Sequence, residues 1–200
     1  MPGLLKLEAL LDEATSAAAV AACQNVRFAP WYCYLAGGKR IDCFGVPPAD
    51  LDCLAVDFRP VAPREDAPFF EAIASRFSGD RNKQFFSDIS GVDLSGTDAT
   101  WMLISWRPTT FTVPHTDQVP GRPTRLVVSL SLTADWHESF GGITHFRWEG
   151  RNDAYTVYPR ANDAIVFRPF PGSLHWVEPI SLAAPANKRY SLTILYRDAV

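Results

Sequence analysis

The second half of the chain consists of short apolar stretches separated by turn residues, and this pattern constrains the fold more than any other feature. From about residue 99 onwards, segments rich in Val, Ile, Thr, Phe and Trp alternate with Pro, Gly, Asn and Asp. Segments of this length and composition are typical of antiparallel strands in a sandwich or barrel. The sequence therefore predicts a jelly roll over residues 99–200.

Two of these segments have one fully apolar face. In "TRLVVSLSL" and "RYSLTILY" the apolar sets are Leu126, Val128, Leu130 and Leu132, and Tyr190, Leu192, Ile194 and Tyr196. The alternate sets are Arg125, Val127, Ser129 and Ser131, and Arg189, Ser191 and Thr193. In a half-solvated sheet the polar sets face water. Alternatively, the apolar sets lie under helices and the polar sets line the interior of the barrel, and the candidate metal ligands described below favour this second interpretation.

The first half of the chain contains helical patterns. Apolar residues recur at helical spacing over residues 4–23 and in "APFFEAIASRFS", and "NKQFFSDI" predicts another helix after the Gly79–Asp80 break. A strand-like run, "RFAPWYCYLAGG", lies between the first two. Helices followed by strands favour an α+β, mainly β fold with the helices packed on one sheet. We expect a single domain over 1–200, with 1–98 as a helical, variable support region.

Composition excludes several classes of partner. Apolar residues make up 47% of the chain, enough for one sizeable core, and the formal net charge is only -3 without a block of basic residues. We therefore expect no nucleic-acid partner. No apolar run approaches the roughly 20 residues that span a bilayer, and the Ala-rich "SAAAVAAC" follows acidic residues, unlike a signal peptide. We expect no membrane association.

The cysteines are Cys23, Cys33, Cys43 and Cys53, ten residues apart and without a C-x-x-C pair. A domain of this size needs no disulfide framework. We interpret them as reduced thiols of a cytoplasmic protein.

His115, Asp117 and His175 form a candidate metal site. Side chains at i and i+2 of an extended segment point to the same side, so His115 and Asp117 can bind one ion together. His175, in "GSLHWVEPI", can join them from another strand of an antiparallel fold. Two imidazoles and one carboxylate leave coordination positions open, as in non-haem Fe(II) oxygenases and unlike closed structural zinc sites.

Motifs over residues 100–198 resemble one family in the right order. They are "WRPTTFTVPHTD", "ADWHESFGGITHF", "VYPRANDAIVF" with Asn162 where glycine is usual, "SLHWVEPI" and "RYSLTILYRD". The chain is similar to the prolyl 4-hydroxylase-like branch of the 2-oxoglutarate- and Fe(II)-dependent dioxygenases. This resemblance implies a double-stranded β-helix, a cupin-like jelly roll. It also implies that dioxygen oxidises 2-oxoglutarate to succinate and carbon dioxide while the substrate is hydroxylated, with ascorbate as a further candidate cofactor.

The resemblance also implies roles for individual residues. His115, Asp117 and His175 would be the iron ligands, and Arg189 would bind the C5 carboxylate of 2-oxoglutarate. A planar guanidinium suits this task because it can donate two parallel hydrogen bonds to a carboxylate. Further expected cosubstrate contacts are Thr193, Ser191, Ser131 in place of a frequent tyrosine, and Trp106, which can equally be a core residue. A carboxylate at position 117 favours hydroxylation, because related halogenases have a small residue there.

The substrate is less constrained than the cosubstrate. Candidate substrate contacts are Arg107, Arg125, His145, Arg147 and Trp148, for each of which a strand-end or surface role explains the residue equally well. His137 is expected in a surface turn, and the loop around 180–188 near the mouth of the site. Because the chain is compact and has no recognisable peptide-binding module, a small molecule such as an amino acid or natural-product intermediate is favoured over a protein prolyl residue. Two further function classes are compatible with the same barrel: a cupin-like metal enzyme that does not use 2-oxoglutarate, and a non-catalytic binding module.

Overall fold

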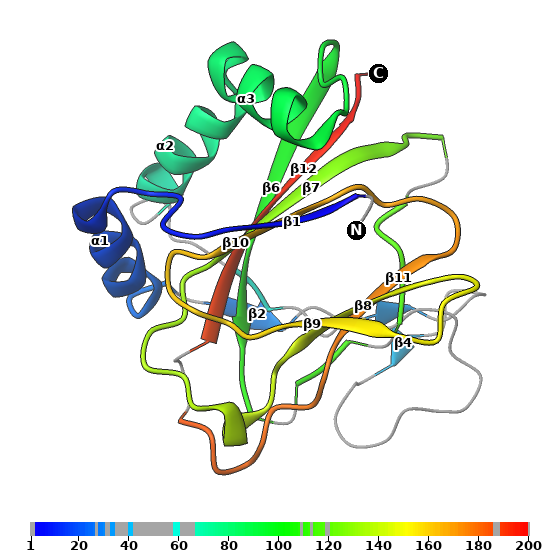
Figure 1. Cartoon of the computed structure of the whole chain (residues 1–200). Coiled ribbons are helices and arrows are strands. Elements are labelled where there is room, and N and C mark those ends of the chain that lie inside the picture. Colours follow the sequence, from blue (N-terminus) through cyan, green and yellow to red (C-terminus); the bar gives the residue numbers. More distant parts are fainter. Residues whose placement is uncertain are drawn as a thin grey trace.

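A computed structural model gives the architecture of the chain. It describes residues 3–26, 28–30, 33–34, 40–41, 58–60, 67–108, 110–112, 114–118, 121–185 and 189–199. Two antiparallel sheets face one another, and helices cover one of them (Figure 1). This arrangement confirms the predicted jelly roll with a helical layer on one sheet.

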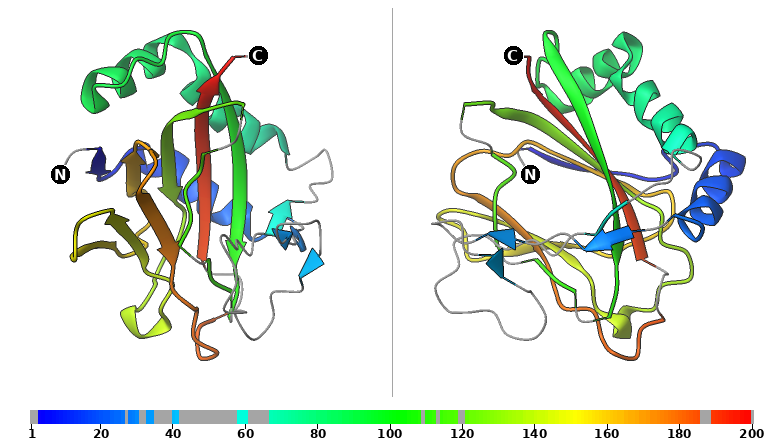
Figure 2. Two further views of the ribbon diagram at one scale, coloured as in Figure 1. Left: turned by 90° about the vertical axis from the view of Figure 1, so that its right-hand side faces the viewer. Right: turned by 180° about the vertical axis from the view of Figure 1, so that it is seen from behind.

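The larger sheet has five strands in the order β1-β10-β7-β12-β6. Their bounds are β1 Leu4–Leu7, β10 Ala164–Phe167, β7 Thr124–Ser131, β12 Arg189–Asp198 and β6 Thr97–Trp106. β6 and β12 pair over ten residues, from Arg189 opposite Trp106 to Asp198 opposite Thr97, and run side by side as the longest strands (Figure 2). β12 also pairs with β7, so its residues occupy the middle of the sheet.

The smaller sheet has three strands in the order β11-β8-β9. Their bounds are β11 Ser173–Val177, β8 Thr144–Trp148 and β9 Ala154–Val157, and a short 3-10 helix, Glu138–Phe140, precedes β8. Two small antiparallel pairs join β2 Phe28–Pro30 to β5 Phe58–Pro60, and β3 Cys33–Tyr34 to β4 Arg40–Ile41. Part of the predicted strand-like run over residues 27–38, including its two glycines, lies outside the described residues.

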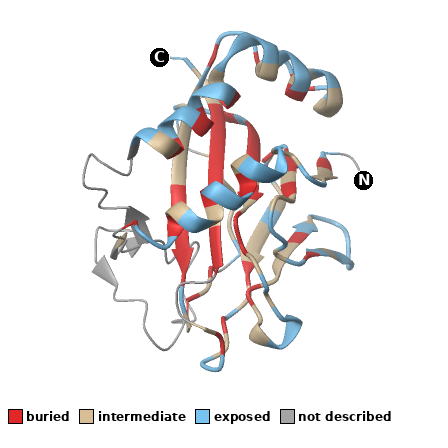
Figure 3. Cartoon of the chain, turned by 90° about the vertical axis from the view of Figure 1, so that its left-hand side faces the viewer, coloured by how far each residue is buried: buried red, intermediate tan, exposed pale blue. Residues whose placement is uncertain are grey.

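The helices pack on the outer face of the larger sheet. α1 Glu13–Cys23, α2 Ala67–Ser78 and α3 Asp80–Ser90 cover its buried strands (Figure 3). One hydrophobic cluster joins residues of these helices, such as Ala19, Phe70 and Phe86, to the predicted apolar sets of β7 and β12. The Tyr196 hydroxyl donates a 2.8 Å hydrogen bond to the Phe77 carbonyl, so its one polar atom is satisfied. The apolar sets therefore lie under the helices, as the second interpretation predicted.

The N-terminal helix is shorter than predicted. Residues 4–7 form β1, which pairs with β10, and helix α1 begins only at Glu13. Asp12 caps α1, because its carboxylate accepts hydrogen bonds from the Thr15 main-chain N–H at 2.8 Å and from the Thr15 hydroxyl at 2.6 Å. The prediction of a helix over 4–23 was wrong at its beginning, because pairing with β10 overrides the helical spacing of the leucines.

Asn162 explains one departure from the family motifs. It has a left-handed backbone conformation with φ 67°, which asparagine tolerates better than most residues. Its side-chain amide accepts a hydrogen bond from the Leu11 N–H and donates one to the Leu11 carbonyl, both at 2.8 Å. Asn162 thus adopts the backbone conformation that glycine would adopt in this turn, and its side chain binds the N-terminal segment at Leu11.

Cys23, the last residue of α1, is a free thiol buried in the core, and burial raises its pKa to about 12. The side chains of the other three cysteines lie outside the described part of the chain. Among the described helices, none has the length and apolar character that a membrane crossing requires.

Candidate metal centre

Main-chain pairing places the two candidate histidine ligands opposite each other. His115 and His175 exchange both backbone hydrogen bonds, at 3.0 and 2.9 Å, and form an antiparallel bridge that joins the His115 segment to β11. Residues paired in this way project their side chains to the same side of the ladder. Their ring centroids are 4.2 Å apart.

Asp117 completes the cluster. Its Oδ1 lies 3.8 Å from His115 Nε2, and its Oδ2 lies 3.5 Å from His175 Nε2. One ligand atom from each of these residues lies within 4.8 Å of the others, which is close enough for a shared metal ion. Burial lowers the pKa of His175 to about 4, an effect that Asp117 partly offsets, so the ring is neutral and can donate its lone pair. The structure brings together the predicted ligand triad.

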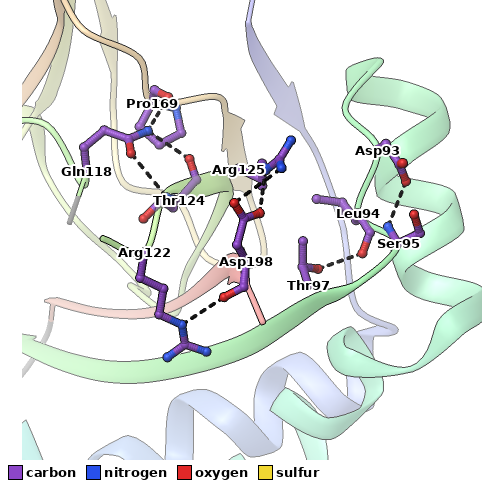
Figure 4. A network of polar contacts seen from close by, with 10 residues as sticks. All are labelled: Asp93, Leu94, Ser95, Thr97, Gln118, Arg122, Thr124, Arg125, Pro169 and Asp198. Atoms are coloured by element: carbon purple, nitrogen blue, oxygen red, sulfur yellow. Dashed lines mark hydrogen bonds and ion pairs between the residues drawn. The ribbon is translucent and has the colours of Figure 1, made fainter. Parts of the chain in front are cut away.

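A polar network fixes the loop that carries Asp117 to the start of β7 (Figure 4). The Thr124 hydroxyl donates a 2.6 Å hydrogen bond to the Asp117 carbonyl. The Gln118 side-chain amide donates to the Thr124 carbonyl at 2.9 Å and to the Pro169 carbonyl at 2.7 Å. These bonds tie the ligand segment to both β7 and the β10–β11 loop. Asp117 thus stands on a braced segment even though it lies outside the regular strands.

Aromatic rings surround the second histidine. The His175 ring stacks on Phe146 with centroids 5.7 Å apart and contacts Phe167 at 4.9 Å. Both phenylalanines are buried. An apolar wall beside a metal ligand limits the access of water and fixes the orientation of the ring.

A cavity of about 300 Å³ lies between the two sheets and includes the metal cluster. The larger sheet contributes alternate residues of β7 and β12: Val127, Ser129, Ser131, Arg189, Ser191, Thr193, Leu195 and Arg197. The polar sets therefore line the interior, as predicted. Arg125, the first residue of the predicted polar set of β7, does not line the cavity.

Arg189 is a buried cation at one end of this cavity. It is 4% exposed, its Nε donates a 3.1 Å hydrogen bond to the Gly142 carbonyl, and its guanidinium lies 4.6 Å from the Trp106 ring centroid. Its Nη1 is buried without a hydrogen-bond partner among the described residues. Burial lowers its pKa to about 9, which the charge of Glu178 partly counteracts. A desolvated cation with an unused donor is costly unless an anionic ligand completes it.

Gly142 permits the close approach of this arginine. A Cβ at this position would lie 3.0 Å from Arg189 Nε and 3.1 Å from its Cδ, and the backbone has φ +70°. Gly142 of the sequence motif is thus required by the arginine as well as by the turn, whereas a Cβ at Gly141 would collide with the Pro179 carbonyl.

Small polar groups follow Arg189 along the same wall of the cavity. Thr193 Oγ1 and Ser129 Oγ lie 3.2 Å apart, and the Trp106 indole donates a 3.0 Å hydrogen bond to Ser191 Oγ. Ser131 Oγ is buried without a partner in the described structure. All five lie along the cavity. The hydroxyls that do not pair with the indole can donate to an anion held by Arg189.

The candidate substrate contacts lie away from the cavity lining. Arg107, Arg125 and Arg147 are exposed, and Arg125 forms a 2.6 Å ion pair with Asp198. His145 stacks on Trp176 with ring centroids 5.1 Å apart and lies 3.1 Å from Glu178. Strand alternation turns His145 and Arg147 away from the cavity, while Trp148 packs against a hydrophobic cluster. The structure does not bring these five residues together with the metal cluster.

Arg197 and Gln118 are among the cavity residues that the sequence analysis missed. Arg197 could have been found by extending the alternation from Arg189 along β12, since every second residue of a strand lies on one face. Gln118 follows the metal-ligand motif directly, but no local signal indicates that its amide would bridge to Thr124 and Pro169. His137, as predicted, lies exposed before a short helix and is no part of the cluster.

Comparison with known proteins gives a match to one family model and a set of solved structures with the same fold. The family model of the 2OG-Fe(II) oxygenase superfamily matches residues 101–197, which include the metal cluster and Arg189. A search of curated protein sequences gave no significant match.

Several solved structures share the fold. A Pseudomonas putida prolyl-4-hydroxylase aligns with TM-score 0.69 and 17% identity, covering 100% of this chain and 94% of that chain. A Trichoplax adhaerens prolyl hydroxylase, in complex with a hypoxia inducible factor peptide, aligns with TM-score 0.64 and 15% identity, covering 99% and 84%. The alpha ketoglutarate dependent epimerase SnoN from nogalamycin biosynthesis aligns with TM-score 0.58 and 16% identity, covering 99% and 79%. At these identities the likeness establishes the fold.

Proposed function

We propose that this chain is a member of the 2OG-Fe(II) oxygenase superfamily, whose family model matches residues 101–197, and that it hydroxylates an unactivated C–H bond of a small molecule. Enzymes of this superfamily are dioxygenases that use Fe(II), 2-oxoglutarate and dioxygen. The observation that carries the proposal is the buried Arg189, which lines the same cavity as the His115, Asp117 and His175 cluster and whose Nη1 has no partner among the described residues. A metal enzyme without 2-oxoglutarate has no need for such a cation.

The donor set suits iron. Two neutral imidazoles and one carboxylate are the ligands of non-haem Fe(II) oxygenases, and they leave positions for cosubstrate and dioxygen. His115, Asp117 and His175 would hold the metal, which supplies the activation of dioxygen when bound. The carboxylate of Asp117 occupies the place that a halide takes in related halogenases, which favours hydroxylation. The neutral state of His175 keeps its lone pair available for the metal.

The cavity residues also suit 2-oxoglutarate. Arg189 would bind the distal carboxylate through its unused donor, and the hydroxyls of Thr193 and Ser131 lie along the same wall. Trp106 covers one side of the guanidinium and fixes its plane. Phe146 and Phe167 limit the access of water on the metal side. These residues would bind and orient the cosubstrate, and the metal and the cosubstrate would supply the oxidative chemistry.

A small-molecule substrate fits this cavity better than a protein. The volume of about 300 Å³ lies at the small end of the range of ligand pockets and includes the cosubstrate region. Similar folds serve both substrate classes, since the aligned structures include prolyl hydroxylases and an epimerase of antibiotic biosynthesis. A prolyl residue of a peptide is therefore the alternative substrate to be tested.

The cosubstrate assignment can be tested without knowing the substrate. Anaerobic addition of Fe(II) and 2-oxoglutarate to the protein should produce the weak visible charge-transfer band of the chelated cosubstrate. His115→Ala should lack this band. His137→Ala is the matched control, because it removes an exposed histidine outside the cluster. A wild-type protein that binds Fe(II) but gives no band would instead be a cupin-like enzyme that does not use 2-oxoglutarate.

The substrate class can be tested by succinate release. Free amino acids, small metabolites and proline-containing peptides are offered in parallel to the Fe(II)-loaded protein with 2-oxoglutarate and dioxygen. We expect a small molecule to stimulate succinate release above the background and to gain one oxygen atom by mass spectrometry. Stimulation by the peptides alone would favour a prolyl hydroxylase.

A further inference from the structure

The cavity face of β12 has an arginine at each end. Arg189 and Arg197 belong to the same alternating set, with Ser191, Thr193 and Leu195 between them, and all five line the cavity. Eight residue-to-residue steps along the strand separate the arginines by about 26 Å. Arg189 is assigned to the cosubstrate, so a single carboxylate cannot explain both cations.

Arg197 lacks the partner that neighbouring arginines have. Arg122 lies 2.8 Å from Asp98, and Arg125 lies 2.6 Å from Asp198. Arg197 makes only long contacts to hydroxyls, from Nε to Thr124 Oγ1 at 3.4 Å and from Nη1 to Thr100 Oγ1 at 3.5 Å. Within the described part of the chain, no carboxylate oxygen lies within 4.0 Å of its guanidinium nitrogens. Its capacity for strong, charge-assisted hydrogen bonds is therefore unused.

The position of Arg197 links it to the metal cluster. Thr124 Oγ1, which Arg197 Nε contacts, donates to the carbonyl of the metal-ligand candidate Asp117 at 2.6 Å. The guanidinium is partly buried, and burial together with the nearby Arg122 lowers its pKa, while the charge of Asp117 opposes this effect. The wall beside the cluster thus carries a positive charge that faces the cavity and forms no ion pair with the described residues.

We propose that Arg197 binds a carboxylate of the substrate and thereby holds the reacting C–H bond at the metal. This inference rests on the proposed function and names the substrate class, a small carboxylic acid. One guanidinium flanked by two neutral hydroxyls balances a single negative charge, because Arg122 is already neutralised by Asp98. A carboxylate meets that requirement better than a phosphate dianion. The planar fork of arginine also fixes the direction of the bound carboxylate.

The test compares acids with their neutral derivatives. Free amino acids, hydroxy acids and aromatic carboxylic acids are each paired with the corresponding methyl ester, and phosphate monoesters are added as a third set. Binding to protein loaded with Zn(II) and 2-oxoglutarate is measured by ligand-observed NMR, so no turnover is needed. We expect acids to bind at least about tenfold more tightly than their esters, which corresponds to about 1.4 kcal/mol.

Variants connect this preference to the residue. Arg197→Gln should abolish the preference for acids, and Arg197→Lys should retain part of it, because it keeps the charge and loses the fork. Arg125→Gln is the matched control, since it removes a nearby exposed arginine that does not line the cavity. A role of Arg197 in positioning Asp117 alone would alter binding of acids and esters equally. Thermal unfolding of each variant confirms that it is folded.

Four outcomes would overturn the inference. These are equal binding of esters and acids, the absence of any acid-selective ligand, tighter binding of phosphate monoesters, and an unchanged acid preference in Arg197→Gln. None of them affects the proposed function, which depends on the anaerobic Fe(II) and 2-oxoglutarate band. That band tests the metal cluster and Arg189, so its absence in the wild-type protein would refute the proposed function independently of Arg197.

Discussion

The two faces of β12 differ in a way that separates folding from chemistry. The outer face carries Tyr190, Leu192, Ile194 and Tyr196, all buried in the cluster under the helices. The inner face carries Arg189, Ser191, Thr193, Leu195 and Arg197 along the cavity. On the outer face the Tyr196 hydroxyl has its partner, whereas Arg189 Nη1 on the inner face has none among the described residues.

This difference teaches where to look for a ligand in a sheet. A buried polar atom without a partner costs stability, so it persists where a ligand completes it or a function requires it. The outer face contributes its free energy through apolar burial. The inner face contributes less stabilisation, because its hydrogen-bond donors are left available for a ligand. Substitutions on the two faces should therefore affect different measurements.

The largest effect is expected at the metal cluster on the cavity side. Asp117→Ala should reduce substrate-dependent succinate release to background, because it removes one of the three ligands. The free energy of unfolding should change by less than about 1 kcal/mol, since the side chain is only partly buried and supports no core packing. Urea unfolding and succinate assays on the same preparations measure both. Full turnover in Asp117→Ala would contradict the metal assignment.

The next effect belongs to the outer face. Leu192 is fully buried between the helices and the sheet, and its sequence neighbours Ser191 and Thr193 line the cavity. Leu192→Ala should lower the free energy of unfolding by about 2–5 kcal/mol, because it leaves a void in the packed core. The folded variant should keep its KM for 2-oxoglutarate. A large change in KM with little loss of stability would show that the two faces are not separable.

The third largest effect is expected at Arg189 on the inner face. Arg189→Ala should raise the KM for 2-oxoglutarate by about 100-fold, the cost of losing charge-assisted hydrogen bonds to a buried carboxylate. Fe(II) affinity should change much less, since the arginine contacts none of the candidate ligands. Arg189→Lys should show an intermediate KM because it keeps the charge without the fork. Unchanged cosubstrate kinetics in Arg189→Ala would mean that another cation anchors the cosubstrate.

Much of this architecture could be predicted because strand alternation is a local property. The apolar sets of β7 and β12 were assigned to the correct face, and the i, i+2 spacing of His115 and Asp117 placed them on one side. Their grouping with His175 was proposed from ligand chemistry and was strengthened by the family motifs, since nothing local specifies which strand pairs with which. The geometry of the cluster agrees with that grouping.

The failures have a physical cause in tertiary pairing. Leu4 and Leu7 fit a helical period, yet they pair with β10 and form a strand. Arg125 shares its alternation with Ser129, but it lies near the beginning of β7, where it pairs with Asp198 in solvent. The alternation of residues predicts which side of the sheet a side chain faces. Only the folded structure shows how far along that side the cavity extends.

The smallest effect tests whether single hydroxyls of the inner face contribute to cosubstrate binding. Thr193→Val keeps the shape of the side chain and removes one hydroxyl, which lies 3.2 Å from Ser129 Oγ. Loss of one hydrogen bond worth about 1 kcal/mol should raise the KM for 2-oxoglutarate about fivefold. Tyr196→Phe is the matched outer-face variant, because it removes a hydroxyl bonded to Phe77 and should lower stability by a similar free energy without changing KM. If both variants changed stability alone, Thr193 would serve the sheet, and the donors for 2-oxoglutarate would be Arg189 and Ser131.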